Sequence, residues 1–176
     1  DYVLSDQLVA ELKNWSPRAD IAAYFAPFIY CVHGRPLRGS LYPPRAVLFH
    51  RARCRYVQDG HTQNLQINGT CARLDGPIYH DDRKSLARWF WAQDRYAELE
   101  ADKLLAAAPG SLTLPDRLGL RIVPAPLLVL FYTLFAKGAL WDGWPGWHYA
   151  LQRTVAESIL SLKLAERRVL GKRNEK

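Results

Sequence analysis

Residues that can do acid–base chemistry gather between Asp59 and Arg95, a stretch that is also rich in aromatic side chains. The first cluster in it, Asp59 to Gln63, reads Asp-Gly-His-Thr-Gln and predicts a turn because it contains glycine. Asp59 and His61 can present a carboxylate and an imidazole to one substrate hydroxyl, as general-base catalysis requires. The turn can instead be purely structural, with Asp59 and Thr62 bonding to nearby backbone.

The second cluster, His80 to Lys84, reads His-Asp-Asp-Arg-Lys and lies where a predicted strand passes into a predicted helix. The free amides of a helix N-terminus favour anions, and Arg83 and Lys84 would add a guanidinium fork and a point charge for a phosphate. The adjacent acids Asp81 and Asp82 can instead help to hold a divalent cation, or one of them can cap the helix. These interpretations are compatible, because one aspartate can cap while the other faces a site.

The elements that must position these clusters belong to a mixed first half of the chain. A helix is predicted from Leu4 to Trp15, with Ser5 or Asp6 as its N-cap. The aromatic and β-branched residues from Asp20 to Val32 predict one strand, or two strands joined near Pro27. The other elements expected here are a loop over residues 33–44, a short strand over 46–50, and a hairpin over 64–79 with its turn at Asn68 and Gly69.

The second half is predicted to be helical, with helices over residues 85–108 and about 148–169. The apolar stripe expected on the first of these helices comprises Leu86, Trp89, Ala92, Tyr96 and Leu99. Between the two helices, the apolar segment 122–136 is shorter than the roughly 20 residues of a membrane-spanning helix. It predicts either an ordinary buried helix or a helix lying on a membrane surface, and the basic residues from Lys163 onward favour an anionic surface.

Composition bounds the classes of protein that fit. A hydrophobic fraction of 49% and a charged fraction of 23% are typical of a globular chain, and the net charge of +7 favours anionic partners. The 3 cysteines are far apart and form no Cys-x-x-Cys pair, so we expect neither a disulfide framework nor a zinc knuckle. The basic residues are scattered and match no nucleic-acid-binding motif, so no nucleic-acid partner is expected. Because the chain opens without methionine and already resembles a helix entrance, we expect a fragment of a longer protein.

Several motifs together resemble the C-terminal half of bacterial family 2 glycosyltransferases, and the similarity covers nearly the whole chain. They are Asp-Gly-His-Thr-Gln, a glycine-containing hairpin, His-Asp-Asp-Arg-Lys-Ser-Leu-Ala-Arg-Trp and Asp-Arg-Tyr-Ala-Glu-Leu-Glu-Ala. The similarity is to membrane-associated members that build lipopolysaccharide core or other surface glycans. The opening Asp-Tyr-Val-Leu-Ser-Asp-Gln-Leu looks like the continuation of their Asp-x-Asp motif, and Lys137 to Trp147 looks like their later Gly-x-x-Asp-Gly-x-x-Gly turn.

The resemblance implies an α/β fold of the GT-A, nucleotide-sugar type, with a mixed sheet and a C-terminal helical appendage. Residues 1–83 would be the acceptor-side part of the α/β domain, and residues 84–176 a helical, membrane-associating extension. The N-terminal nucleotide-binding half would lie outside this chain, which alone would be inactive. The implied activity is the inverting transfer of a sugar from a nucleotide-sugar donor to a lipid-linked or surface-glycan acceptor. It would take place at the cytoplasmic face of the bacterial inner membrane.

The resemblance also assigns roles to particular residues. Asp1 matches the last acid of Asp-x-Asp, which holds a divalent metal (Mg or Mn), and His80 matches a histidine that contacts the metal or the diphosphate. The turn from Asp59 to His61 matches the segment that meets the acceptor, with Asp59 as the first candidate for the base and His61 as the second. Relatives often have His-Glu where this chain has His61 and Thr62, which is a departure at the site of the base.

Arg83 and Lys84 would lie near the diphosphate of the donor. An alternative from another class is a non-catalytic module that docks on a membrane or a protein through its tryptophan-rich and basic C-terminal helices. The two readings differ in whether replacement of Asp59 abolishes sugar transfer.

Overall fold

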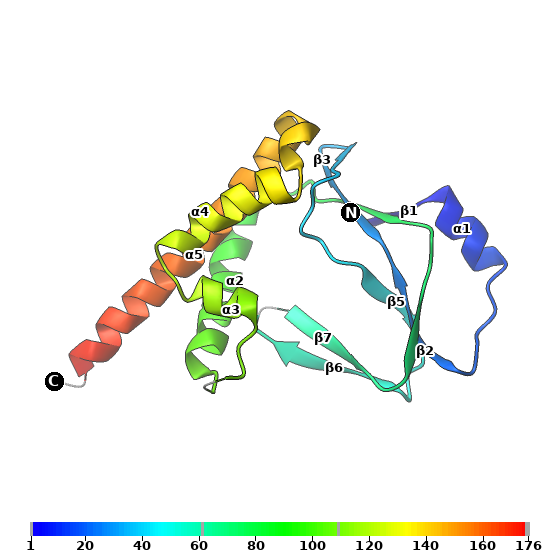
Figure 1. Ribbon diagram of the computed structural model, residues 1–176, viewed down its shortest axis with the longest axis horizontal. Coiled ribbons are helices and arrows are strands. Elements are labelled where there is room, and N and C mark those ends of the chain that lie inside the picture. Colours follow the sequence, from blue (N-terminus) through cyan, green and yellow to red (C-terminus); the bar gives the residue numbers. More distant parts are fainter. Residues whose placement is uncertain (1, 61, 109, 175–176) are drawn as a thin grey trace.

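The computed structural model describes residues 2–60, 62–108 and 110–174 and has a mixed α/β architecture (Figure 1). Helices account for 47% and strands for 25% of the chain, which confirms the predicted α/β class at that level. The first half contains β1 (Tyr2–Leu4), α1 (Asp6–Lys13), β2 (Ile21–Ala26), β3 (Phe28–Val32), β4 (Arg35–Pro36), β5 (Arg45–Phe49), β6 (Cys54–Asp59), β7 (Thr62–Ile67), β8 (Thr70–Arg73) and β9 (Ile78–Asp81). The second half contains α2 (Leu86–Ala106), α3 (Leu114–Gly119), α4 (Pro124–Phe131), the π-helical turn η1 (Tyr132–Ala136), the 3-10 turn η2 (Ala139–Asp142) and α5 (Trp144–Asn174). The proposed division at residue 83 into two domains stays a prediction.

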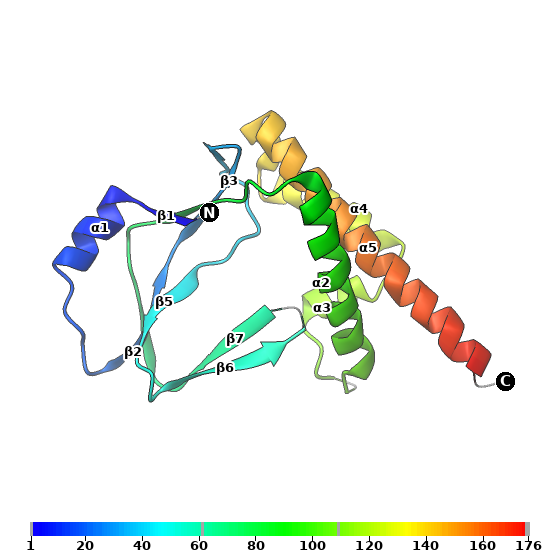
Figure 2. The same ribbon diagram turned by 180° about the vertical axis from the view of Figure 1, so that it is seen from behind.

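The described strands form small sheets rather than one large one. The first has the order β1-β9-β3-β4, with β3 parallel to β9 and the other pairs antiparallel. The second has the order β5-β2-β8, in which the buried strand β2 runs antiparallel to β5 and parallel to β8. The third is a ribbon of β6 and β7 that extends from the other strands toward α2 and α3 (Figures 1 and 2).

Local sequence signals account for α1 and the strands that follow it. The Ser5 hydroxyl accepts a hydrogen bond from the Leu8 amide at 3.1 Å, which confirms Ser5 as the N-cap. Leu8 is buried against β2 and the segment leading to β9. A Cβ atom at Gly76 would collide with the backbone of Leu8, so glycine allows this close packing. The prediction of two strands joined near Pro27 is also confirmed, because β2 ends at residue 26 and β3 begins at residue 28.

The predicted hairpin over residues 64–79 is wrong. β7 pairs with β6, so the hairpin turn lies between Asp59 and Thr62 and not at Asn68-Gly69. β8 lies parallel to β2 instead of pairing with β7. The pairing places β8 beside β2, a strand whose Ala22 and Ala23 are buried, so β2 has a hydrogen-bonded neighbour on each side.

The predicted apolar stripe of α2 is also wrong. Leu86, at its start, is 58% exposed, and the buried residues of the helix are Ala97, Ala101 and Leu104. These residues pack against Leu160 and Leu164 of α5, so the two helices approach each other over small side chains. Large apolar residues therefore did not mark the buried face. Helix α5 lies between α2 and α4, as the two opposite views show (Figures 1 and 2).

The sequence analysis missed α3 and the true length of α5. α3 is held by a capping box in which the Thr113 hydroxyl accepts a bond from the Asp116 amide and the Asp116 carboxylate accepts one from the Thr113 amide. α5 extends beyond the predicted 148–169 at both ends. Cys31, Cys54 and Cys71 are all free thiols, which agrees with the expectation of no disulfide framework.

A buried carboxylate joins the two halves of the chain. The Asp142 side chain is 4% exposed and accepts hydrogen bonds from the backbone amides of Arg38 and Gly39 at 2.9 and 3.0 Å. Close by, the Tyr149 hydroxyl accepts a bond from the Leu41 amide at 3.0 Å. These contacts fix the segment between β4 and β5 against η2 and α5, and thereby fix one wall of the cleft described next.

Candidate functional site

A cleft of about 380 Å³ lies between the sheet β1-β9-β3-β4 and the helices α2 and α5. We call it the aromatic cleft, because rings from several elements line it: Tyr2, Tyr30, Tyr42, Trp89, Tyr96 and Tyr149. Its cationic side chains are Arg45, Lys84 and Arg153, and the amides of two glutamines are also present. Such a lining combines flat apolar faces with hydrogen-bonding and cationic groups, as in sites for polar organic ligands.

His80 stands at the centre of the tyrosine rings. Its ring centroid lies 4.4 Å from that of Tyr2, 5.3 Å from that of Tyr30 and 5.2 Å from that of Tyr42. Burial lowers the pKa of His80, so its imidazole is neutral at neutral pH. Its Nδ1 atom is buried and has no hydrogen-bond partner among the described residues, which leaves one polar atom of the cleft unsatisfied.

The hydroxyls of Tyr42 and Tyr30 stay protonated and can donate hydrogen bonds. Burial, together with the hydrogen bond to the Tyr2 hydroxyl, raises the pKa of Tyr42 to about 12. The pKa of Tyr30 is raised as well, mainly by burial and to a lesser degree by the nearby charge of Asp82. The ring of Tyr30 lies 5.0 Å from that of Tyr149, so the sheet and α5 meet through aromatic contact at the base of the cleft.

The second predicted cluster is placed partly in the cleft. Arg83 Nε donates to the Asp81 carboxylate at 2.7 Å, and Lys84 Nζ lies 3.2 Å from the Asp82 carboxylate. Lys84 and Asp82 line the aromatic cleft, whereas Arg83 lines a neighbouring cavity of about 340 Å³. Neither aspartate caps α2, because the Ser85 hydroxyl accepts the bond from the first turn of the helix. The two predicted phosphate-binding cations are therefore each paired with an acid two residues earlier.

The first predicted cluster lies at the tip of the β6–β7 ribbon. Thr62 lines the aromatic cleft and donates from its hydroxyl to the Asp59 carbonyl at 3.1 Å, as the structural reading of the turn predicted. The Asp59 carboxylate accepts a bond from the Asn64 amide at 2.6 Å and lies 2.9 Å from Lys103 Nζ. Asp59 thus lies beside the cleft with its charge already balanced by α2. His61 and Asp1 lie outside the described residues.

Lys103 is the residue of this region that the sequence analysis did not connect to Asp59. Its ammonium also lies 3.2 Å from the Glu100 carboxylate and 3.3 Å from that of Asp116. Burial alone would lower the pKa of Lys103, but the bond to Asp59 and the charges of Glu100 and Asp116 outweigh it, so the pKa is raised. Gly60 has a φ of +57°, and a side chain there would collide with Glu100, so glycine lets the ribbon tip close on α2.

Replacement of Lys103 by methionine should destabilise the fold by about 2 kcal/mol, because three carboxylates lose the cation that they share. The measurement is the free energy of unfolding from urea denaturation. Lys13→Met is the matched control, since Lys13 is exposed in the last turn of α1, and its expected change is within about 0.5 kcal/mol. Equal stabilities of the two variants would show that the Lys103 ion pairs do not hold the ribbon.

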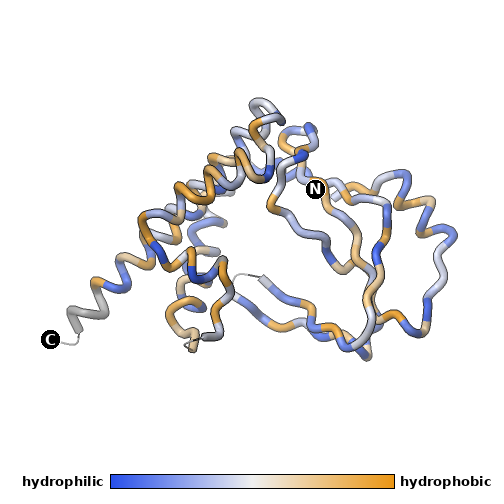
Figure 3. Tube along the Cα trace, viewed as in Figure 1, coloured by the Kyte–Doolittle hydropathy of each residue, from blue (hydrophilic) through white to orange (hydrophobic). Residues whose placement is uncertain are grey.

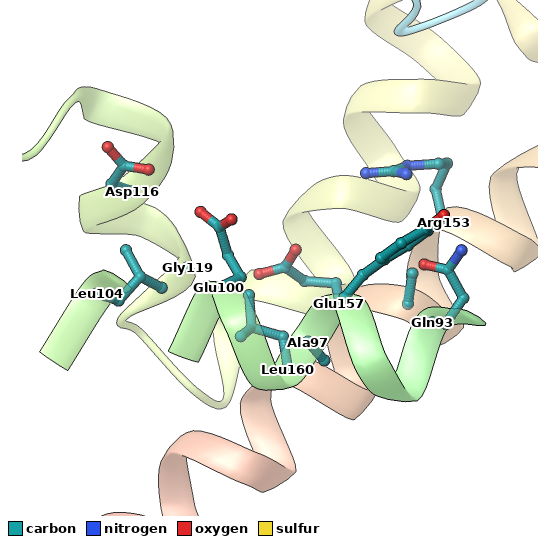
Figure 4. A pocket seen from close by; sticks show the side chains of 11 residues that line it. Gln93, Ala97, Glu100, Leu104, Asp116, Gly119, Arg153, Glu157 and Leu160 are labelled. Atoms are coloured by element: carbon teal, nitrogen blue, oxygen red, sulfur yellow. The ribbon is translucent and has the colours of Figure 1, made fainter. Parts of the chain in front are cut away.

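A second cavity, of about 210 Å³, adjoins the aromatic cleft, because Gln93, Tyr96 and Arg153 line both (Figure 4). Glu100 from α2 and Glu157 from α5 line this second cavity. Burial raises the pKa of Glu157, and Glu100 acts in the same direction while Arg153 opposes it. The cleft therefore passes from an aromatic and basic part to an acidic end.

The predicted metal ligands do not complete a metal centre within the described residues. No group of three or more histidine, cysteine, aspartate or glutamate side chains in that part of the chain is arranged to hold a metal ion. His80 has tyrosine rings around it, and Asp81 and Asp82 are ion-paired with the two residues that follow them. The described side chains thus supply aromatic, cationic and amide groups to a ligand.

Comparisons with known proteins give no match. The scan against protein-family models, the search of the curated proteins and the search of the solved structures each found none. The structure is that of a mixed α/β protein in which helices α2 and α5 form one side of an aromatic and basic cleft.

Proposed function

We propose that this chain forms the acceptor side of an inverting glycosyltransferase with a GT-A-type α/β fold. It would help to transfer a sugar from a nucleotide-sugar donor to a hydroxyl of a lipid-linked or surface-glycan acceptor. The observation that carries the proposal is the aromatic cleft. Aromatic faces pack against the C–H faces of sugar rings, and its cations, Arg45, Lys84 and Arg153, suit the charge of a diphosphate.

The reaction is a single displacement. The acceptor hydroxyl attacks the anomeric carbon opposite the leaving group, a new C–O bond forms, and the bond to the nucleoside diphosphate breaks. We assign the proton of the attacking hydroxyl to a base on the β6–β7 turn, with Asp59 first and His61 second. Arg83 and Lys84 would stabilise the negative charge of the departing diphosphate once they exchange their aspartate partners for it.

We propose a divalent metal, Mg or Mn, as the cofactor, with Asp1 and His80 as ligands. Only His80 of this pair belongs to the described residues, and the groups around it there do not complete a metal site. Binding and orientation of the sugars must then come from the tyrosine hydroxyls, the two glutamines and Arg153. The neutral imidazole of His80 and the protonated Tyr42 hydroxyl can both take part in hydrogen bonds to sugar hydroxyls.

The test is sugar transfer by the full-length protein with a panel of nucleotide sugars and a lipid-linked glycan acceptor. Arg153→Gln should lower kcat/KM by about 10- to 100-fold, because a hydrogen bond to a charged group contributes about 1.5–3 kcal/mol. Arg88→Gln on the exposed surface of α2 is the control and should leave kcat/KM unchanged. A folded protein that transfers no sugar from any donor, or an Arg153 variant with full kcat/KM, would count against the proposal.

A non-catalytic docking module is the second candidate. Exposed apolar side chains along α4, such as Leu127 and Phe131, favour it. Such a module would bind its partner equally well when the aromatic cleft is altered. Sugar transfer by the full-length protein, sensitive to Arg153→Gln, separates the two candidates.

A further inference from the structure

Helix α4 and the turns η1 and η2 carry an apolar surface that no described part of the chain covers. We call it the α4 face, and it consists of Leu127, Leu128, Phe131, Tyr132, Phe135 and Trp141. Trp141 is 79% exposed and Phe135 is 61% exposed, whereas Ala125 of α4 and Thr133 and Leu134 of η1 are buried. The trace of α4 is mostly hydrophobic, and the helix packs against α5 (Figures 1 and 3).

The exposed charges of residues 117–156, the segment that carries the α4 face, are of one sign. Residues 117–156 contain a single acid, Asp142, and its buried carboxylate is occupied by the amides of Arg38 and Gly39. Arg117 and Arg121 are exposed before α4, and Lys137 follows η1 with its ammonium 5.7 Å from the Tyr132 ring. An anionic surface can therefore approach the apolar face without meeting an exposed carboxylate from this segment.

We infer that the α4 face docks on the surface of an anionic lipid bilayer. Apolar side chains would enter the boundary between headgroups and acyl chains, while the flanking cations contact the headgroups. A second copy of this chain fits less well, because the same face would offer no acid to the partner's Arg117, Arg121 and Lys137. No described helix has both the length and the apolar character that crossing a bilayer requires.

The cations that meet the headgroups differ from those expected from the sequence. Lys163 lies 2.8 Å from the carboxylates of both Asp94 and Glu98 on α2. Arg167 is paired with Glu98 and Asp102. Lys163 and Arg167 of α5 therefore pair with acids of α2, and we assign the headgroup contacts to Arg117, Arg121 and Lys137.

Co-flotation of the full-length protein with vesicles tests this surface. The protein should float with vesicles of phosphatidylcholine and phosphatidylglycerol and bind phosphatidylcholine alone more weakly. The double variant Phe131→Ser/Phe135→Ser should weaken binding at least about 100-fold, because two large apolar side chains no longer enter the bilayer. Trp91→Ser/Leu105→Ser removes two exposed apolar side chains from α2 and should bind as the unaltered protein does.

A charge variant tests the headgroup contacts separately. Arg121→Gln/Lys137→Gln should weaken binding to the anionic vesicles about 30-fold, at roughly 1 kcal/mol per cation, and leave binding to phosphatidylcholine unchanged. The control Arg88→Gln/Arg95→Gln removes two exposed cations from α2.

Two results would overturn the inference. One is a folded protein that floats with neither vesicle. The other is a dimer in sedimentation that Phe131→Ser/Phe135→Ser dissociates, since the face would then bind a second copy. Transfer to a water-soluble acceptor fragment reports on the aromatic cleft alone, so failure of docking and failure of the proposed function are distinguishable.

Discussion

Replacement of Asp59 by asparagine in the full-length protein is expected to lower kcat for sugar transfer by about 10²- to 10⁴-fold. Asparagine keeps the size of the side chain and can still contact Asn64, but it cannot take the proton of an acceptor hydroxyl. Asp59 lies at the end of β6, three residues before Thr62, which lines the cleft. The measurement is single-turnover transfer at saturating donor and acceptor, which reports the chemical step.

The ion pair between Asp59 and Lys103 supplies the control for this experiment. If Asp59 serves only to hold the ribbon against α2, Lys103→Met should reduce kcat as much as Asp59→Asn does. If Asp59 is the base, Lys103→Met should reduce kcat far less, because the carboxylate is still present. Wild-type turnover by a normally folded Asp59→Asn protein would rule out Asp59 as the base.

Replacement of Gly146 by alanine is expected to lower the free energy of unfolding by about 3 kcal/mol, the upper part of the usual range for overpacking. A Cβ atom at position 146 would overlap the carbonyl oxygen of Ala139 and come within 3.0 Å of the Asp142 Cβ. Both are parts of η2, whose backbone would have to move. Urea denaturation followed by circular dichroism measures the loss.

Gly119→Ala is the matched control for that substitution. The nearest atom to a Cβ at position 119 is Glu157 Oε1 at 3.5 Å, which is ordinary contact, and Gly119 ends α3 without a positive φ. Alanine there should be neutral or stabilise the protein by up to about 1 kcal/mol. Unchanged stability of the Gly146 variant would mean that η2 is not tightly packed against the start of α5.

The parts of the fold that the sequence predicted are those that short-range signals determine. Ser5 marks the start of α1, and Pro27 separates two strands. The errors concern pairing between segments. Asn68-Gly69 has the composition of a hairpin turn, but the partner of β8 is β2, more than forty residues earlier in the chain. Local composition cannot report which strand needs a neighbour to complete its burial.

In the candidate site, too, some residues were predicted from the sequence and others were missed. Lys84 was predicted as a site residue from its position at a helix N-terminus, and His80 from the resemblance to glycosyltransferases. Both line the aromatic cleft. The partner of Asp59 was missed, because Lys103 had a satisfactory local partner in Glu100 and nothing in the sequence indicated a second. The tyrosine rings were missed as a group since they come from β1, β3, the segment before β5, α2 and α5. Only the folded chain brings them together.

The link from Asp142 to the amides of Arg38 and Gly39 has a consequence for how the protein is made. The bonded residues are 104 and 103 positions apart, so at roughly 5–20 residues per second a ribosome needs about 5–20 s to supply the carboxylate. Until then the segment carrying Tyr42 lacks two of its anchors. The aromatic cleft is thus completed only after its sheet has had time to form.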